Sequence, residues 1–335
     1  MKSSWLRISL IGITILVIVY YLGPRPAVPR YDLLLPKVPP ETGALEHYIA
    51  QKESRHHLKP DNEARIIWND SIPRKTAYSV VYLHGFSASQ KEGDPVHRDF
   101  ARRYGCNLYL SRLDGHGIDT SEPLLNMTAS GLWQDAKEAL SIGKALGDKV
   151  IIIGTSTGGT LALQLAASYP NDVYAVINLS PNIAINDDLV FLVNNPWGLQ
   201  ISRLVKHGKY NESPPVSPAR SQYWYDRYRL EAVVELENLL ETTMQQSTFR
   251  KIKQPVLDLY YFKDQAHQDP TVKVSAILEM HRQLGTPPGL KQAIAIPNAQ
   301  AHVIGSSITS HDIPAVERAI NAFAEQKLGL VPQAR

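Results

Sequence analysis

Short apolar segments alternate with amphipathic ones along most of the chain. The clearest apolar segment is 150–153, Val-Ile-Ile-Ile, which is β-branched and uncharged, as expected of a parallel strand covered on both faces. Further strands are predicted at 64–68, 78–83, 107–110, 173–179, 256–262 and 293–296. Helices are predicted at 97–103, 131–146, 160–169, 271–284 and 313–328. This alternation predicts an α/β fold with a mainly parallel, doubly wound sheet.

Two stretches interrupt the alternation. Residues 182–250 are rich in Asn, Pro, Tyr and Trp and are predicted to form a separate cap. Residues 24–63 are predicted to be a lead-in, because their first part, 24–40, contains six prolines and is typical of an extended linker. The sequence therefore predicts a core in two parts, 64–181 and 251–335, with the cap inserted between them.

The amino-terminal segment, residues 1–23, has the pattern of a membrane-targeting sequence. Lys2 and Arg7 precede a run of 15 residues without charge, Ile8 to Leu22. The run ends without a small-residue cleavage site, so we expect an uncleaved membrane anchor, with a cleaved secretory signal as the alternative. The basic residues before the run favour an extracytoplasmic location, periplasmic or extracellular, for the rest of the chain.

Composition excludes several classes of protein. The 335 residues suffice for one large core with an insertion, and the net charge of +3 is scattered, so no nucleic-acid partner is expected. Cys106 is the only cysteine and is predicted to be a buried thiol. No His or carboxylate pair has metal-ligand spacing, so neither a metal nor a cofactor is expected. The oligomeric state is left open.

The segment Gly154-Thr155-Ser156-Thr157-Gly158 lies between a predicted buried strand and a predicted helix. In that context the pattern G-x-S-x-G predicts a nucleophilic serine at a sharp turn, Ser156, with Gly154 and Gly158 leaving room for neighbouring backbone. The alternatives are a glycine-rich helix entry or a phosphate-binding loop, but the latter would require a lysine that is missing here.

A serine hydroxyl needs a base and an orienting acid to act as a nucleophile at neutral pH. His302 follows the last predicted strand and is the candidate base, with His311 as its nearest competitor. Asp264 follows the preceding predicted strand directly and is the candidate acid. Asp258 within that strand and Asp269 farther along the loop are the alternatives.

The oxyanion of the reaction needs two backbone N–H donors. One is predicted at Thr157, directly after the nucleophile, and the other at Phe86, in the turn that follows the strand 78–83. Gly85 would let that turn approach the nucleophile.

The ordered set His84-Gly85-Phe86, Gly154 to Gly158, Asp264 and His302 resembles the α/β-hydrolase superfamily over about residues 78–330. Asp114-Gly115-His116-Gly117 makes the chain similar to the branch of monoacylglycerol lipases, carboxylesterases and related serine peptidases, and His116 is expected to order its own loop. The resemblance implies that the cap follows the sixth strand and lies over Ser156. Thr157 stands where many of those lipases have Met, which removes apolar surface from the pocket.

These features predict a serine hydrolase that cleaves small carboxylic esters through a Ser-His-Asp triad and an acyl-enzyme intermediate. The alternatives are hydrolysis of an amide, peptide or thioester by the same residues, or a non-catalytic, membrane-tethered binding protein with this fold. Activity towards peptides is ranked behind activity towards esters, because no dense acidic cluster prepares the cap for a peptide amino terminus.

Overall fold

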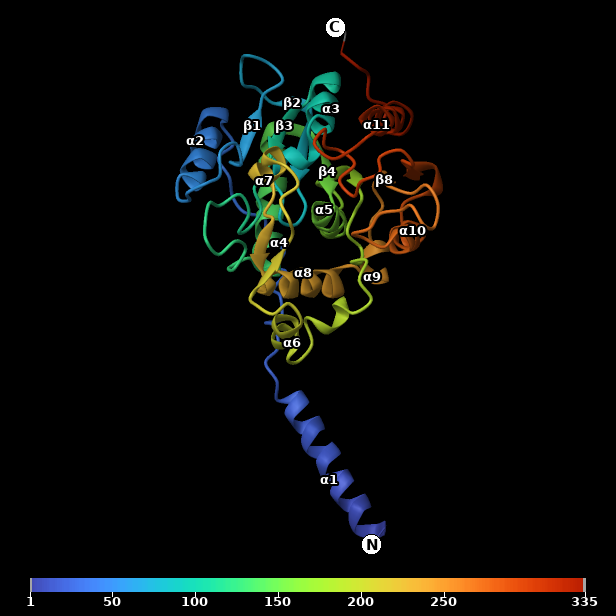
Figure 1. Cartoon of the computed structure of the whole chain (residues 1–335). Helices are drawn as coiled ribbons and strands as arrows, with labels where there is room; N and C mark the ends of the chain where they lie inside the picture. The colour runs from blue at the N-terminus through green and yellow to red at the C-terminus, as the bar shows by residue number, and fades with distance from the viewer. Residues whose placement is uncertain (1, 334–335) are drawn as a thin grey trace.

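The computed structural model describes residues 2–333 and has a mixed seven-stranded sheet at its centre (Figure 1). The strand order is β1-β3-β2-β4-β5-β8-β9, and all neighbours are parallel except β1 and β3. The strands are β1 (Arg65–Ile67), β2 (Thr76–Leu83), β3 (Asn107–Leu110), β4 (Gly147–Thr155), β5 (Val173–Leu179), β8 (Val256–Tyr260) and β9 (Lys291–Ala295). The predicted mainly parallel α/β fold is confirmed.

Helices cover both faces of this sheet. Side chains of β4 alternate between two hydrophobic clusters: Val150 and Ile152 pack into one, and Ile151 and Ile153 pack into the other. All four are at most 1% exposed, which explains the uninterrupted apolar sequence of this strand. The first face carries α4 (Ala129–Leu146), α5 (Thr157–Ser168) and α10 (Val274–Gln283), and the second carries α3 (Val96–Tyr104) and α11 (Ile313–Lys327).

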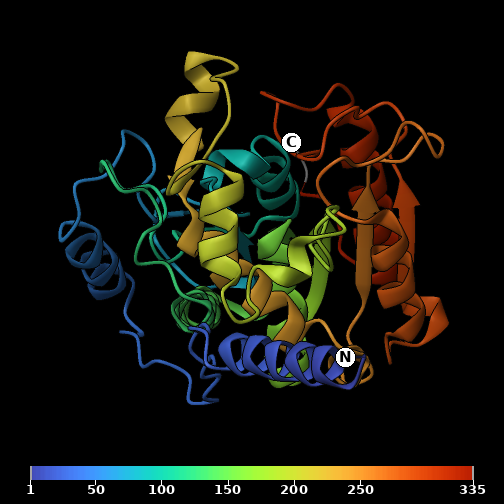
Figure 2. The same cartoon turned by 60° about the horizontal axis from the view of Figure 1, so that its bottom comes forward.

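The cap lies between β5 and β8 in the chain and covers one side of the core (Figures 1 and 2). It therefore follows the fifth strand of this sheet and not the sixth, because β1 to β5 precede it and the lead-in contributes the helix α2 (Thr42–Glu53). The cap elements are η2 (Val190–Leu192), α6 (Gly198–Val205), β6 (Tyr210–Glu212), α7 (Pro218–Tyr223), β7 (Arg227–Arg229), α8 (Leu230–Thr243) and α9 (Gln246–Phe249).

The proline-rich segment 24–40 is extended, as predicted, but it packs against the domain. The Asp32 carboxylate pairs with Lys137 Nζ at 2.6 Å, and the Asp32 carbonyl accepts a 2.9 Å hydrogen bond from the Trp133 indole. Asn238 of α8 donates to the carbonyl of Ala27 at 2.9 Å. The segment thus connects α4 with the cap helix α8.

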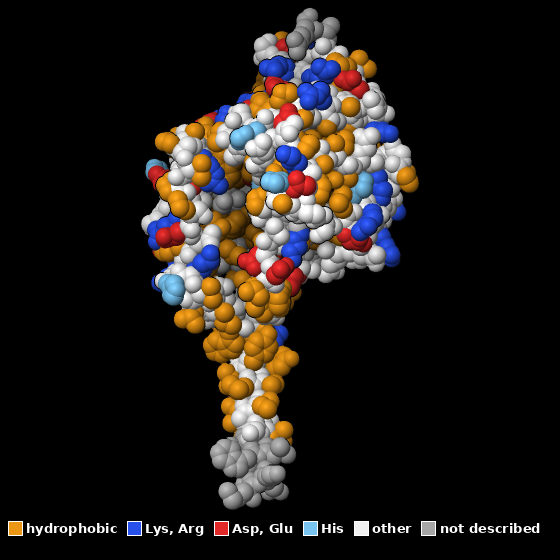
Figure 3. Space-filling view, turned by 45° about the vertical axis from the view of Figure 1, so that its right-hand side comes forward, with side chains coloured by type: hydrophobic (Ala, Val, Ile, Leu, Met, Phe, Trp, Pro, Cys, Tyr) orange, Lys and Arg blue, Asp and Glu red, His pale blue; other side chains and the backbone are white. Residues whose placement is uncertain are grey.

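Residues Lys2–Tyr21 form a single helix, α1, which leaves the domain on the side of α6 (Figures 1 and 2). Hydrophobic side chains, including Leu16 and Leu22, are exposed along and just after it (Figure 3). In the described part of the chain, no helix has both the length and the apolar character needed to cross a membrane. The predicted membrane anchor is therefore not supported, since its charge-free run is shorter than the about 20 apolar residues that a span requires. Met1 and residues 334–335 lie outside the described residues.

Candidate active site

Ser156 occupies the turn between β4 and α5. Its backbone has φ 52° and ψ −117°, a region that residues other than glycine rarely adopt. Neighbouring backbone holds it there, because the Ser156 N–H donates to the carbonyl of Leu179 at 3.0 Å and the Ser156 carbonyl accepts from Asn182 N–H at 3.0 Å. The strained turn that the sequence predicts at this serine is present.

The glycines around Ser156 are explained by close backbone contacts. A Cβ on Gly158 would lie 1.9 Å from the carbonyl oxygen of Leu83, and one on Gly154 would meet the backbone of Gly158 at 2.5 Å. A Cβ on Gly85 would lie 2.9 Å from the Cβ of Ser156. The loop after β2 and the turn after β4 therefore touch, and side chains at these positions would push them apart.

The two predicted oxyanion donors belong to these two segments. Phe86 lies in the loop after β2, and Thr157 is the first residue of α5. Within residues 2–333, neither backbone N–H has a protein hydrogen-bond acceptor. Both N–H groups are thus available to an oxyanion close to Ser156.

Two buried histidines hold the loop that carries Phe86. His84 Nδ1 donates to the Gly85 carbonyl at 2.9 Å, and His84 Nε2 accepts from Leu113 N–H at 3.1 Å. His116 Nε2 accepts from Ser87 N–H at 2.9 Å, while its Nδ1 donates to the Asp114 carbonyl at 2.8 Å. Burial lowers the pKa of both imidazoles, which suits the neutral form that these bonds require. His116 therefore orders the Phe86 loop as well as its own.

His302 lies in the loop after β9, and its side chain is 13% exposed. Its Nδ1 is 2.7 Å from Oδ2 of Asp269, a fully buried carboxylate. The other oxygen of this carboxylate, Oδ1, accepts hydrogen bonds from the N–H groups of Thr271 at 2.8 Å and Val272 at 3.1 Å. Burial alone would raise the pKa of Asp269, but His302 and these two donors lower it below its ordinary value. Burial by itself would lower the pKa of His302, but the negative charge of Asp269 raises this pKa above its ordinary value.

The structure does not bring Asp264, the predicted acid, to His302. Its side chain is 52% exposed and pairs with His267 Nδ1 at 2.8 Å, closing a surface turn with the N–H of Ala266. The prediction extended the strand to residue 262, whereas β8 ends at Tyr260. Asp269, the alternative farther along the loop, is the carboxylate that reaches His302.

The other two alternatives lie outside the site. Asp258 is buried within β8, accepts a 2.7 Å hydrogen bond from Asn178, and is 2.7 Å from Nδ1 of His281. His311 is exposed just before α11, where its backbone N–H donates to the carbonyl of Ala299.

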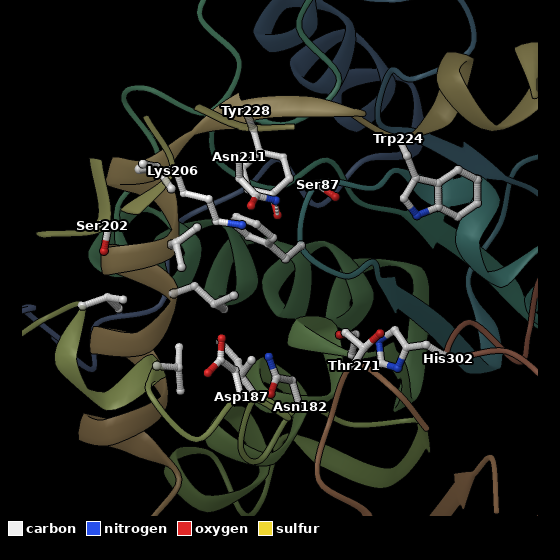
Figure 4. A pocket seen from close by; sticks show the side chains of 18 of the residues that line it. Ser87, Asn182, Asp187, Ser202, Lys206, Asn211, Trp224, Tyr228, Thr271 and His302 are labelled. Atoms are coloured by element: carbon white, nitrogen blue, oxygen red, sulfur yellow. Dashed lines mark hydrogen bonds between the residues drawn. The ribbon is translucent and has the colours of Figure 1, made fainter. Parts of the chain in front are cut away.

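A cavity of about 600 Å³ lies between the core and the cap (Figure 4). Ser156, Phe86 and His302 line it from the core side. Figure 4 shows His302 on one side of the view and Ser202 of α6 on the opposite side. Much of the cap side is apolar and includes Val190, Val193, Ile201, Leu230, Val233 and Leu236.

Two residues of the cavity were not identified from the sequence. Glu92, in the short 3₁₀ helix η1 (Gln90–Gly93), lines the cavity although it is only 2% exposed. Asn182, directly after the turn that follows β5, lines it with an amide oxygen that has no partner within the described residues. Both lie in irregular segments, so no periodicity marks them. Among the described residues, no group of three or more His, Cys, Asp or Glu side chains is arranged to hold a metal ion.

The sheet order, the strained serine turn after β4 and the histidine after the last strand define the α/β-hydrolase fold. Residues 74–277, more than half of the chain, match the family model Hydrolase_4, described as serine aminopeptidase, S33, and the chain belongs to this family. No curated protein sequence matches the chain.

Several solved structures share the fold at low sequence identity. A structure reported with LipS and LipT, two metagenome-derived lipolytic enzymes, is 19% identical with a TM-score of 0.64, over 80% of this chain and 98% of that chain. A soluble variant of monoglyceride lipase from Saccharomyces cerevisiae is 14% identical with a TM-score of 0.58, over 82% and 92%. Est1E from Butyrivibrio proteoclasticus, with ferulic acid bound, is 15% identical with a TM-score of 0.56, over 80% and 95%.

Proposed function

We propose that the protein is a serine hydrolase of carboxylic esters, with Ser156 as nucleophile, His302 as base and Asp269 as the acid that orients His302. The observation that carries the proposal is the 2.7 Å contact between His302 Nδ1 and the buried carboxylate of Asp269. His302 and Ser156 line the same cavity. Because Nδ1 is engaged, Nε2 is the ring nitrogen left for the serine proton.

In the proposed reaction, Ser156 Oγ attacks the ester carbonyl carbon while His302 Nε2 accepts the hydroxyl proton. The carbonyl oxygen becomes an oxyanion, which the N–H groups of Phe86 and Thr157 bind. His302 then gives its proton to the departing alcohol, leaving an acyl group on Ser156. Water, deprotonated by His302, attacks this acyl-enzyme, and His302 returns the proton to Ser156 Oγ as the carboxylic acid leaves. Asp269 stabilises the imidazolium at each transfer.

The charged groups around the cavity bear on the choice between an ester and a peptide with a free amino terminus. Such a peptide would need an unpaired carboxylate for its ammonium group. The Glu92 carboxylate beside Gly85 already accepts a hydrogen bond from Gly85 N–H. Lys206 and Arg220 line the cavity and would repel an ammonium group, whereas Asp187, which also lines it, would attract one. The two cations thus support ester hydrolysis despite the peptidase description of the family, and Asp187 is the carboxylate at which a peptide amino terminus would bind.

The proposal is tested by assaying the full-length protein on matched nitrophenyl esters, acylglycerols, acyl thioesters and aminoacyl nitroanilides. We expect the highest kcat/KM on an oxygen ester and covalent labelling by a fluorophosphonate. A preference for aminoacyl nitroanilides would replace the proposal with an aminopeptidase, and a protein that neither turns over nor labels would contradict it.

The apolar cap wall also predicts which part of the ester the cavity accepts. A cavity of about 600 Å³ lined by Ile201, Val233 and Leu236 suits an acyl chain. We expect Ile201→Trp to lower kcat/KM for a decanoate ester about tenfold or more, while kcat/KM for an acetate ester stays close to wild type. The ratio of the two rates measures the effect.

Leu204→Trp is the matched control for this substitution. Leu204 lies on the same helix, α6, but is 75% exposed and is not part of the cavity wall. We expect its ratio of decanoate to acetate hydrolysis to remain that of the wild type. Equal ratios for the two Trp variants would show that the acyl chain does not enter the cavity beside α6.

A further inference from the structure

Glu92 is a buried carboxylate at the centre of the candidate active site that the proposed acyl transfer does not use. It lies in η1, eight positions after His84, and is 2% exposed. One carboxylate oxygen accepts a hydrogen bond from Gly85 N–H, in the loop that carries the Phe86 oxyanion donor. The side chain of Trp224, which belongs to the cap, also faces the carboxylate and contributes to lowering its pKa. Glu92 therefore lies between the oxyanion loop and the cap.

The spacing around Gly85 shows how close this carboxylate is to the nucleophile. A Cβ on Gly85 would lie 2.8 Å from each carboxylate oxygen of Glu92 and 2.9 Å from the Cβ of Ser156. Glu92 and Ser156 thus both lie against Gly85. A movement of the Glu92 carboxylate would shift the Gly85 peptide and, with it, the adjoining N–H of Phe86.

The ionisable groups that face Glu92 come from three segments. Burial raises the pKa of Glu92 to about 7. The Gly85 hydrogen bond, the charge of His302 in the loop after β9 and that of Arg220 in α7 oppose this rise. Tyr82 of β2 also faces Glu92, and the Glu92 charge adds to the burial that raises the pKa of that phenol. Within residues 2–333, the carboxylates that favour the charged form of His302 are Asp269 and Glu92.

We propose that Glu92 is a positioning residue of the reaction, which aligns the oxyanion loop through Gly85 and stabilises the charged form of His302 by its own negative charge. The inference rests on the proposed function of the site. Its first part is a hydrogen-bonding role, because an ionised carboxylate holds the Gly85 N–H more strongly than a neutral acceptor does. Its second part is electrostatic, because an anion near an imidazole favours the imidazolium that forms as Ser156 loses its proton.

Two substitutions separate the parts. Glu92→Gln removes the charge and leaves one acceptor, whereas Glu92→Asp keeps the charge and shortens the reach to Gly85. Glu237→Gln is the matched control, since Glu237 is also a buried carboxylate with its pKa raised to about 7 by burial, but it lies on α8 and does not line the cavity. The full-length variants are compared by kcat and KM on a short nitrophenyl ester across pH, and by NMR titration of His302.

For Glu92→Gln we expect kcat to fall about tenfold or more with little change in KM, because the oxyanion contact forms in the transition state. The pKa of His302 should fall on loss of the nearby anion, so the acid limb of the kcat/KM profile should move to lower pH. For Glu92→Asp we expect a lower kcat with the acid limb near its wild-type position. Glu237→Gln should match the wild type in both measurements.

A wild-type kcat and acid limb in Glu92→Gln would overturn the inference, as would a shift that Glu237→Gln reproduces. If Glu92→Gln does not fold, Glu92→Asp decides: a wild-type kcat contradicts the alignment, and an acid limb at lower pH contradicts the charge effect. The NMR titration does not depend on turnover. An inactive wild type whose His302 pKa still falls in Glu92→Gln would contradict the proposed function and leave the electrostatic contact standing.

Discussion

Replacing Ser156 with alanine is expected to abolish ester hydrolysis, with a loss of at least about 10⁴-fold in kcat. The substitution removes the hydroxyl oxygen that would form the proposed acyl-enzyme and leaves the proposed oxyanion donors and the cavity in place. Hydrolysis of a short nitrophenyl ester and labelling by a fluorophosphonate measure the effect. Both signals should disappear together, because both report the same nucleophile.

Ser180→Ala is the matched control. Ser180 is also fully buried and also has a positive φ, 48°, at the end of β5, yet it is not part of the proposed reaction. We expect this variant to label and turn over like the wild type. Labelling that persists in Ser156→Ala but disappears in Ser180→Ala would identify Ser180, at the end of the neighbouring strand, as the nucleophile.

Asp269→Asn is expected to lower kcat about 10³- to 10⁴-fold while the protein stays folded. The amide offers His302 a donor as well as an acceptor, so the imidazole is no longer held with its proton on Nδ1 and Nε2 free. The loss of the anion also lowers the pKa of His302, because the Asp269 charge raises it in the wild type. The remaining activity should therefore have its acid limb at lower pH, which a kcat/KM profile measures.

Two other aspartates serve as controls for this substitution. Asp264→Asn changes an exposed turn and should leave kcat near the wild-type value. Asp258→Asn should retain much of the activity, since Asp258 contacts Asn178 and His281 and not His302. If kcat fell as much in Asp264→Asn as in Asp269→Asn, Asp264, which the sequence favoured, would again be the candidate acid.

The core of the fold was predictable because parallel strands covered on both faces leave a strong signal. Segment 150–153 is uniformly apolar, since its alternate side chains enter two different hydrophobic clusters. The cap was recognisable as a break in this pattern, but its helices were not predicted. α2 was also missed, because its 12 residues do not have a marked apolar face.

The candidate site was predictable where a residue is tied to a regular element. Ser156 adjoins a strand and a helix, and His302 follows the last strand. The acid lies in an irregular loop, where the distance along the chain does not determine the distance in space. The Asp269 carboxylate accepts hydrogen bonds from the N–H groups of Thr271 and Val272. These residues therefore form a turn, and α10 begins at Val274 instead of the predicted residue 271. The turn places the Asp269 carboxylate beside His302.

The sequence by itself determined the alternation of strands and helices, the serine turn and the order of the catalytic candidates, because each depends on neighbours within a few residues. Only the tertiary structure decided the contacts between distant segments. It brought Asp269 to His302, packed the proline-rich segment against α4 and α8, and placed Glu92 across Gly85 from Ser156. Such contacts depend on how loops of separate elements meet at one edge of the sheet, which no local pattern encodes.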